Sequence, residues 1–229
     1  MDDIPAEVNA EHDLVSPFLT PGAEVRKDAR HLPHWRLDSA FYFLTWRLAD
    51  SLPQEKLRAW KAEREAWLVK HPRPWDDKTM RDYRDRFPKR LEAWLDAGYG
   101  ACHLRSPRCA NIVADSLHHF DGDRYDLASF IVMPNHVHVL FQLRTDTALE
   151  SVTHSWKSYS AKQINKALGR SGTLWQQESW DHLLRGIPHL DRCLSYIALN
   201  PMQAKLSPGE YLYYEAPGFR ESTGLDAPE

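Results

Sequence analysis

Two histidines, His136 and His138, are separated by one residue, a spacing at which both side chains could take part in the same chemistry. They begin an apolar run, residues 136–143, whose composition is typical of a β-strand. Residues i and i+2 of a strand point to the same face, so the two imidazoles would stand side by side and could hold a divalent metal ion. The apolar residues that alternate with this face, Val137, Val139, Phe141 and Leu143, would face a core. One strand would therefore carry half of a metal site and part of the hydrophobic core.

A tyrosine and an asparagine near the end of the chain are candidate partners for this pair. The spacing of apolar residues predicts a helix from Ile187 to Asn200, ended by Pro201. Tyr196 and Asn200 are one turn apart and lie together at one edge of its apolar stripe. A metal held by neutral imidazoles and a side-chain oxygen can polarise a phosphate, and a tyrosine hydroxyl can attack it as a nucleophile. The combination indicates phosphoryl transfer.

Composition fits a soluble globular protein with one domain and extensions. The chain has 229 residues, of which 42% are hydrophobic and 27% charged. No apolar run approaches the ~18 residues that a membrane helix needs, and the acidic N-terminus lacks the apolar segment of a secretory signal. We therefore expect a cytoplasmic protein. The three cysteines form no Cys-x-x-Cys pair, which argues against a disulfide framework.

The net charge of −3 argues against the generally basic surface of a nonspecific nucleic-acid binder. Charge is unevenly distributed, however, and residues 151–205 contain seven Lys and Arg but only three Asp and Glu. This segment can form a locally basic face. Trp175 and Trp180 in this segment could stack on bases or pack in the core. Our candidate DNA contacts are Lys157, Lys162, Arg170, Trp175 and Arg185.

The order of predicted elements indicates an α+β fold. Short antiparallel strands alternate with helices, as in a ferredoxin-like sheet with helices packed on it, plus a helical insertion and terminal extensions. A two-residue turn, Pro134-Asn135, is predicted to join the histidine strand to the strand before it. The insertion is predicted as two helices, the second running from about 76 to 97. The expected domains are an arm at 1–30, a main domain at 31–206 with the insertion at about 52–98, and a tail at 207–229.

The run from Phe130 to Leu140, with Met133-Pro134-Asn135-His136-Val137-His138 at its centre, resembles the His-hydrophobic-His strand of the HUH single-strand DNA endonucleases. More closely, it resembles the REP-associated tyrosine transposases of bacteria. The likeness spans about residues 35–206. The further pieces that fit in the same order are Trp156-Lys157-Ser158-Tyr159, Gly172-Thr173-Leu174-Trp175-Gln176, Asp181-His182 and Tyr196-Ile197-Ala198-Leu199-Asn200-Pro201.

The resemblance implies an enzyme of DNA transposition that acts on single-stranded DNA. Family members cut near hairpins formed by repetitive extragenic palindromes (REP), link the tyrosine to the 5′ phosphate, and rejoin the strand by the reverse step. Carried over by position, His136 and His138 bind Mg²⁺ or Mn²⁺, Tyr196 is the nucleophile, and Asn200 completes the metal ligands. The implied partner is a single-stranded DNA hairpin, with no small-molecule cofactor and no membrane. We expect a monomer or weak dimer in the nucleoid-associated cytoplasm.

Three alternatives stay open at this point. Tyr159 is a rival nucleophile, although its place on an apolar stripe favours core packing. A domesticated DNA-hairpin-binding protein with little or no turnover would keep the same fold. A small-molecule metallohydrolase would need further His, Asp or Glu ligands at strand ends, and the sequence offers no convincing set.

Overall fold

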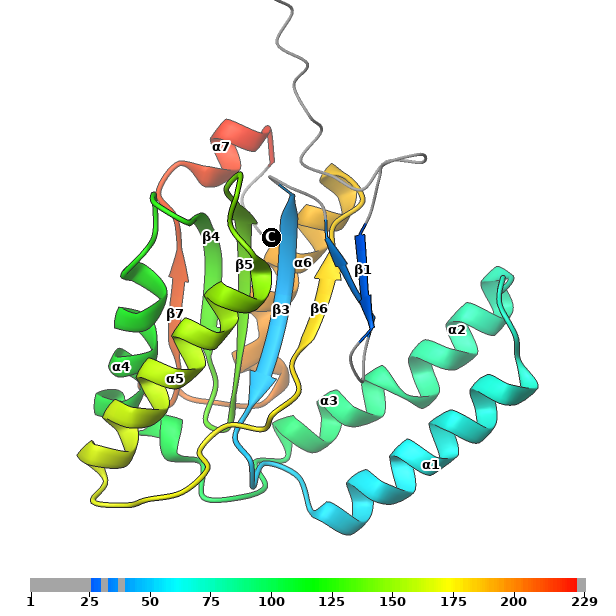
Figure 1. Cartoon of the computed structure of the whole chain (residues 1–229), viewed down its shortest axis with the longest axis horizontal. Coiled ribbons are helices and arrows are strands. Elements are labelled where there is room, and N and C mark those ends of the chain that lie inside the picture. Colours follow the sequence, from blue (N-terminus) through cyan, green and yellow to red (C-terminus); the bar gives the residue numbers. More distant parts are fainter. Residues whose placement is uncertain (1–25, 30–32, 37–39, 226–229) are drawn as a thin grey trace, which may run out of the picture.

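A five-stranded antiparallel sheet forms the centre of the computed structural model, which describes residues 26–29, 33–36 and 40–225. The strand order is β6-β3-β5-β4-β7 (Figure 1). The α+β prediction is thereby confirmed, whereas the predicted arm at 1–30 lies, apart from 26–29, outside the described residues. A separate pair is formed by β1 (Arg26–Ala29) and β2 (Pro33–Arg36). The five strands are β3 (Phe41–Arg47), β4 (Tyr125–Val132), β5 (His136–Leu143), β6 (Trp180–Leu183) and β7 (Leu212–Glu215).

The β4–β5 hairpin sets the position of the histidines. The predicted two-residue turn is confirmed, because the Met133 N–H donates to the His136 carbonyl oxygen at 2.9 Å, which leaves Pro134 and Asn135 as the central residues. β5 also pairs with β3, and Arg47 is the register partner of His136. The end of β3 and the start of β5 therefore meet at one end of the sheet.

Helices cover the two faces of the sheet differently (Figure 1). α4 (Pro107–His118) and α5 (Leu149–Ala167) pack on one face, around Trp46 and Trp156. α6 (Ile187–Gln203) packs on the other, around Phe43 and Ile197. α6 continues past Asn200, so the predicted helix end is wrong. Pro201 lies in the last turn, where its missing N–H removes only one hydrogen bond.

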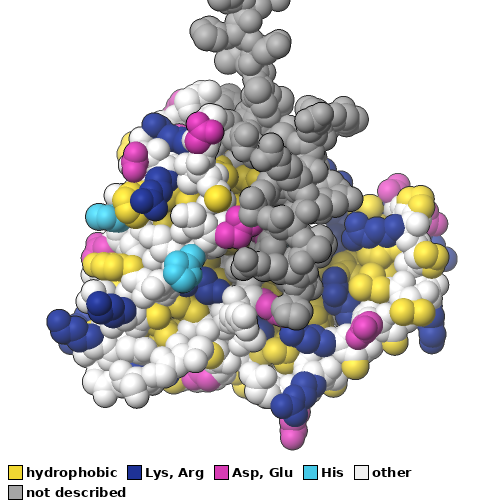
Figure 2. All heavy atoms as spheres, viewed as in Figure 1, with side chains coloured by type: hydrophobic (Ala, Val, Ile, Leu, Met, Phe, Trp, Pro, Cys, Tyr) yellow, Lys and Arg dark blue, Asp and Glu magenta, His cyan; other side chains and the backbone are white. Residues whose placement is uncertain are grey.

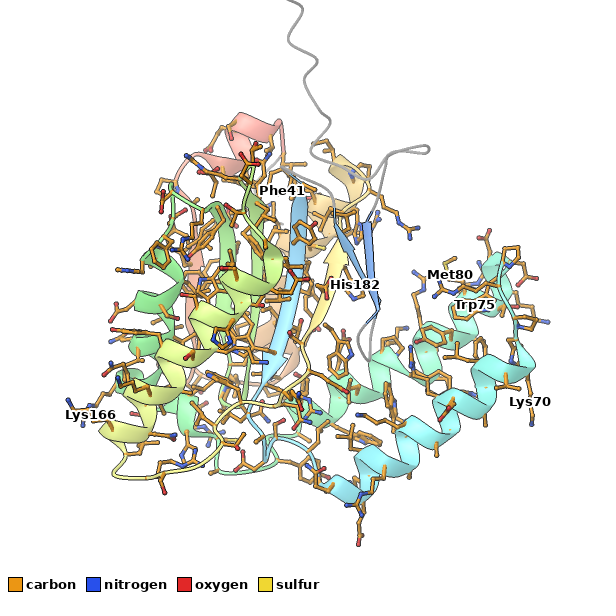
Figure 3. All side chains as sticks on the ribbon, in the orientation of Figure 1. Phe41, Lys70, Trp75, Met80, Lys166 and His182 are labelled. Carbon is orange, nitrogen blue, oxygen red and sulfur yellow. The ribbon has the colours of Figure 1, made fainter. Side chains whose placement is uncertain are left out.

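The predicted helical insertion lies beside the sheet and is called the arm from here on, as distinct from the N-terminal segment 1–30. It consists of α1 (Gln54–Lys70), α2 (Asp77–Arg86) and α3 (Pro88–Asp96), with a core of its own (Figure 1). The single second helix that we predicted is wrong, because the chain breaks at Phe87, before Pro88, which has no N–H to continue the hydrogen bonds of the helix. Figure 3 places Lys70, Trp75 and Met80 at the outer end of this arm, away from the sheet.

Lys and Arg on the arm are interspersed with acidic and hydrophobic side chains (Figure 2). Three of them form ion pairs, Lys61 with Glu178 at 3.2 Å, Lys89 with Asp85 at 2.6 Å and Arg90 with Glu63 at 2.6 Å. This pattern fits a solvated face better than a nucleic-acid patch.

The C-terminal segment is part of the fold. β7, within the predicted tail at 207–229, adds an edge strand beside β4. It is followed by α7 (Phe219–Thr223), and a short 3-10 turn, η1 (His103–Arg105), precedes α4. In the part of the chain that the structure describes, no helix is both long enough and apolar enough to cross a membrane.

Candidate active site

The two histidines lie side by side, as their spacing predicts. His136 and His138 are the first and third residues of β5 and share the face that α6 covers. Their ring centroids are 4.7 Å apart, with an interplanar angle of 80°. Their side chains are almost fully buried, with exposed fractions of 1% and 2%. A buried imidazole pair of this kind is a candidate metal site.

A hydrogen-bond chain through Asn135 sets the orientation of His136. The Asn135 amide nitrogen donates to the carbonyl oxygens of Leu95, at 3.0 Å, and Tyr99, at 3.3 Å. Its Oδ1 therefore faces His136 Nδ1, 2.7 Å away, and accepts a hydrogen bond from it. Because the proton is on Nδ1, His136 Nε2 keeps a free lone pair.

His138 is held in the same way by the neighbouring strand. Its Nδ1 lies 2.7 Å from Thr45 Oγ1, and its Nε2 points toward α6. Burial lowers the pKa of His136 to about 3, with a further contribution from the positive charge of Arg47. Burial and the neighbouring His136 lower the pKa of His138 well below its usual value. Both rings are therefore neutral near pH 7, which is the state that binds a metal ion.

Tyr196, the predicted nucleophile, lies beside this pair. Its hydroxyl oxygen is 3.4 Å from His138 Nε2, and the two ring centroids are 5.1 Å apart. Phe43 packs against both rings, at 5.5 and 5.8 Å. α6 and β3 thus hold the hydroxyl against the imidazole.

Tyr159, the rival nucleophile, is on the opposite side of the sheet. It belongs to α5 and is 50% exposed, so the predicted core packing is wrong. The buried stripe of α5 passes through Val152, Trp156 and Ser160, which leaves Tyr159 one position outside it. Tyr159 is therefore not brought together with the histidines.

Two carboxylates from the helical insertion complete the surroundings of Tyr196, and no pattern in the sequence predicts them there. Glu92 and Asp96 are one turn apart on α3, and both carboxylates lie near enough to Tyr196 for their charges to affect its pKa. Burial raises the pKa of Tyr196, and the two negative charges raise it further. Burial also raises the pKa of Asp96 to about 6, and it raises that of Glu92 together with the charge of Asp96. Their i,i+4 spacing can be read from the sequence. The approach of α3 to Tyr196 on α6 is a tertiary contact that the sequence pattern does not predict.

The residues present fit a divalent cation. The described residues contain no cluster of three or more His, Cys, Asp or Glu that could hold a metal. Asn200, however, is 1% exposed, and its Oδ1 has no hydrogen-bond partner in this structure. Its side chain contacts Tyr196, which adjoins His138. An orphaned buried acceptor next to the tyrosine that adjoins His138 is compatible with a third, weaker oxygen ligand.

Most of the candidate DNA contacts lie away from this site, but burial and the nearby positive charge of Arg47 lower the pKa of Lys157 to about 8. Lys157 donates to the Gln176 and Gln177 carbonyl oxygens at 2.8 and 2.9 Å. Lys157, Lys162 and Arg170 belong to α5 or the loop after it, on the other face of the sheet, and Arg185 is exposed between β6 and α6. Trp175 is 5% exposed, donates to Ser160 Oγ at 3.0 Å and packs in the core, so packing accounts for it without DNA. Contact of this set with DNA stays a prediction.

Part of the chain matches a known protein family. Residues 106–184 match the family model described as "Transposase IS200 like". The match contains both histidines and ends before Tyr196. It confirms, at the level of the family, the resemblance inferred from the motifs. Residues 106–184 of the chain are therefore similar to the IS200-like transposases.

Two solved structures are similar to parts of the chain. One is a REP-associated tyrosine transposase bound to a REP hairpin, with 15% identity and a TM-score of 0.42, covering 76% of this chain and 74% of that one. The other is a candidate transposase from Deinococcus radiodurans R1, with 15% identity and a TM-score of 0.30, covering 76% and 97%. A search of curated proteins found no match. Both structural similarities are too low to transfer a function.

Proposed function

We propose that this protein cleaves and rejoins single-stranded DNA at REP-type palindromic hairpins through a 5′-phosphotyrosine intermediate on Tyr196. The observation that carries the proposal is the position of the Tyr196 hydroxyl, 3.4 Å from Nε2 of a buried, neutral His138. The family match over residues 106–184 supports the reaction class. The preference for hairpins comes from the motif resemblance to REP-associated transposases.

The proposed step is an exchange of one phosphorus–oxygen bond for another. The Tyr196 oxygen bonds to the phosphorus, and the bond from that phosphorus to the 3′ oxygen of the preceding nucleotide breaks. The proton lost by the tyrosine is balanced by the proton that the released 3′ oxygen gains. Rejoining is the reverse step. Glu92, whose carboxylate lies near the hydroxyl, would orient it for attack.

His136, His138 and Asn200 would hold the Mg²⁺ or Mn²⁺ ion that the family implies. When bound, such an ion supplies positive charge that polarises the phosphate and favours the tyrosinate. The protein keeps both imidazoles neutral by burial and fixes their orientation through Asn135 and Thr45. Without an added cation, burial and the two carboxylates of α3 hold Tyr196 in its protonated, unreactive form.

One observation favours a second candidate, a DNA-hairpin-binding protein with little or no turnover. The two histidines and Asn200 are at most 2% exposed. α3 contributes to this burial, because Asn135 donates to its Leu95 carbonyl oxygen and the Glu92 carboxylate lies near Tyr196. Cleavage would require that DNA reach the hydroxyl past α3, whereas binding alone would not.

The experiment is a covalent-adduct assay with a single-stranded oligonucleotide that carries the palindrome flanking the gene, in Mn²⁺. The wild type is expected to form a denaturant-resistant protein–DNA band. Tyr196→Phe should bind the oligonucleotide and form no adduct. Tyr159→Phe is the matched control and should form the adduct normally, since Tyr159 is exposed on the other face. An undiminished adduct in Tyr196→Phe would exclude the nucleophile assignment. Tight binding without cleavage in any divalent metal would support the second candidate.

A further inference from the structure

Arg47 is a buried cation that forms no ion pair with any residue in the described part of the chain. It is the last residue of β3 and is 3% exposed. Its Nη1 donates to Ser51 Oγ at 3.1 Å, and its guanidinium carbon lies 5.8 Å from the Trp180 ring centroid. Among the described residues no carboxylate oxygen lies within 4.0 Å of its nitrogens. The negative charge of Glu178 raises the pKa of Arg47, but the Glu178 carboxylate forms its ion pair with Lys61, at 3.2 Å.

Such a group is unfavourable unless something else satisfies it. A guanidinium has five N–H donors in a planar fork, and the hydrogen bonds within the described chain use one. Burial lowers the pKa of Arg47 to about 10, and Glu178 offsets only part of this effect. Buried charges in proteins are normally paired or bind a charged ligand. The unused donors of Arg47 are therefore available to an anion.

The location of Arg47 indicates which anion. Arg47 and His136 are directly opposed in the antiparallel β3–β5 pair, so their side chains point to the same face. Thr45, two residues earlier and hence also on this face, bonds to His138. The positive charge of Arg47 reaches His136, whose pKa it lowers. Arg47 thus lies next to the imidazole pair, on the face that carries Tyr196.

We propose that Arg47 is the phosphate-binding residue of this site, and that its guanidinium donates to the non-bridging oxygens of the DNA phosphodiester that Tyr196 attacks. The proposal rests on the proposed function and assigns a further residue to it. A phosphodiester supplies the anion that the buried guanidinium lacks, and its oxygens match the planar fork. In phosphoryl transfer the same charge stabilises the negative charge that develops on the phosphate.

A structural role is the competing explanation. Arg47 bonds to Ser51 in the turn after β3, and it lies over Trp180, whose ring is 6.5 Å from Trp60 of α1. In that case the residue would only help to seat the arm against the sheet. The two roles differ in one respect, because a structural role does not depend on the charge of the DNA phosphate.

The first test is binding of a fluorescent oligo(dT) in EDTA, where no cleavage occurs. Arg47→Gln should weaken binding by about 10-fold or more, the effect of losing hydrogen bonds between charged groups. Arg144→Gln is the matched control. It removes one exposed positive charge that pairs with Asp126 at 2.6 Å, and it should bind within about twofold of wild type. Wild-type affinity in Arg47→Gln would overturn the proposal.

The second test uses the adduct assay with a methylphosphonate at the linkage that the wild type cleaves. This substitution removes the charge that Arg47 would bind. The rate gap between wild type and Arg47→Gln should be about 10-fold or more on phosphodiester DNA and should close on the methylphosphonate. A gap of equal size on both substrates would show a structural role and overturn the proposal.

The outcomes separate this proposal from the proposed function. If the wild type forms an adduct and Arg47→Gln forms it equally fast, Arg47 is not the phosphate-binding residue and the function stands. If the wild type forms no adduct, the function fails, and the oligo(dT) comparison still decides the role of Arg47. If Arg47→Gln does not fold, Arg47→Lys decides it. That variant keeps the charge and loses the fork, and wild-type binding and cleavage by it would overturn the proposal.

Discussion

Replacing Asn135 by alanine should both destabilise the protein and weaken its metal site. The side chain is 1% exposed and joins α3 to the histidine strand through contacts with Leu95, Tyr99 and His136. The Leu95 carbonyl oxygen also accepts from the Gly98 N–H at 3.0 Å, so it stays satisfied. The Tyr99 carbonyl oxygen and the His136 Nδ1–H lose their side-chain partner.

The magnitude follows from these contacts. A net hydrogen bond contributes about 1 kcal/mol, and a buried donor left without a partner costs about 1–3 kcal/mol. Asn135→Ala should therefore lower the free energy of unfolding by about 2–4 kcal/mol. Loss of the group that orients a metal-binding histidine typically lowers metal affinity by about 10–100-fold. The same variant should accordingly need more Mn²⁺ for an equal gain in stability.

Urea unfolding with and without Mn²⁺ measures both effects. Asn111→Ala is the matched control, because Asn111 is exposed on α4, away from the site, and its replacement should change stability by less than about 0.5 kcal/mol. A loss below about 0.5 kcal/mol in Asn135→Ala, together with an unchanged Mn²⁺ dependence, would refute the argument that Asn135 couples the arm to the metal pair.

Three further results are expected. Asp96→Asn should raise the free energy of unfolding at pH 7 by on the order of 1–3 kcal/mol, because burial raises the pKa of Asp96 to about 6 and its ionised form costs stability above that pH. The gain should fade toward pH 4, where the native carboxyl is protonated, and urea unfolding across this range checks it. Trp60→Ala should cost about 3–5 kcal/mol in thermal or urea unfolding, because the ring is 7% exposed and packs against Trp180. Mn²⁺ at about 100 times its Kd should stabilise the wild type by about 2.7 kcal/mol, whereas His138→Ala, or EDTA, should abolish both this gain and cleavage.

Local patterns predicted the parts of the site that lie within one element. His136 and His138 share a face because strand periodicity is 2, and Tyr196 and Asn200 share one because helix periodicity is 3.6. The apolar stripe that packs α6 against the sheet was also predictable, and it brings Tyr196 to His138. Periodicity, however, misplaced Tyr159, because a one-residue error in the assumed stripe moves a side chain from core to solvent.

The residues that were missed depend on contacts between distant elements. Thr45 and Arg47 lie on β3. Their place beside the histidines follows from the β3–β5 register, which periodicity does not determine. Glu92 and Asp96 belong to an arm whose return to the sheet is set by tertiary bonds, among them that from Asn135 to Leu95. Pro88, the first residue of α3, is the local sequence signal for the break between α2 and α3.

The most direct test of the central claim is mass spectrometry of the covalent protein–DNA adduct after digestion with protease and nuclease. The site described here requires that the nucleotide phosphate be found on the peptide that contains Tyr196, in a Mn²⁺-dependent reaction. A phosphorylated nucleotide on Tyr159 or any other residue, with Tyr196 unmodified, would contradict it.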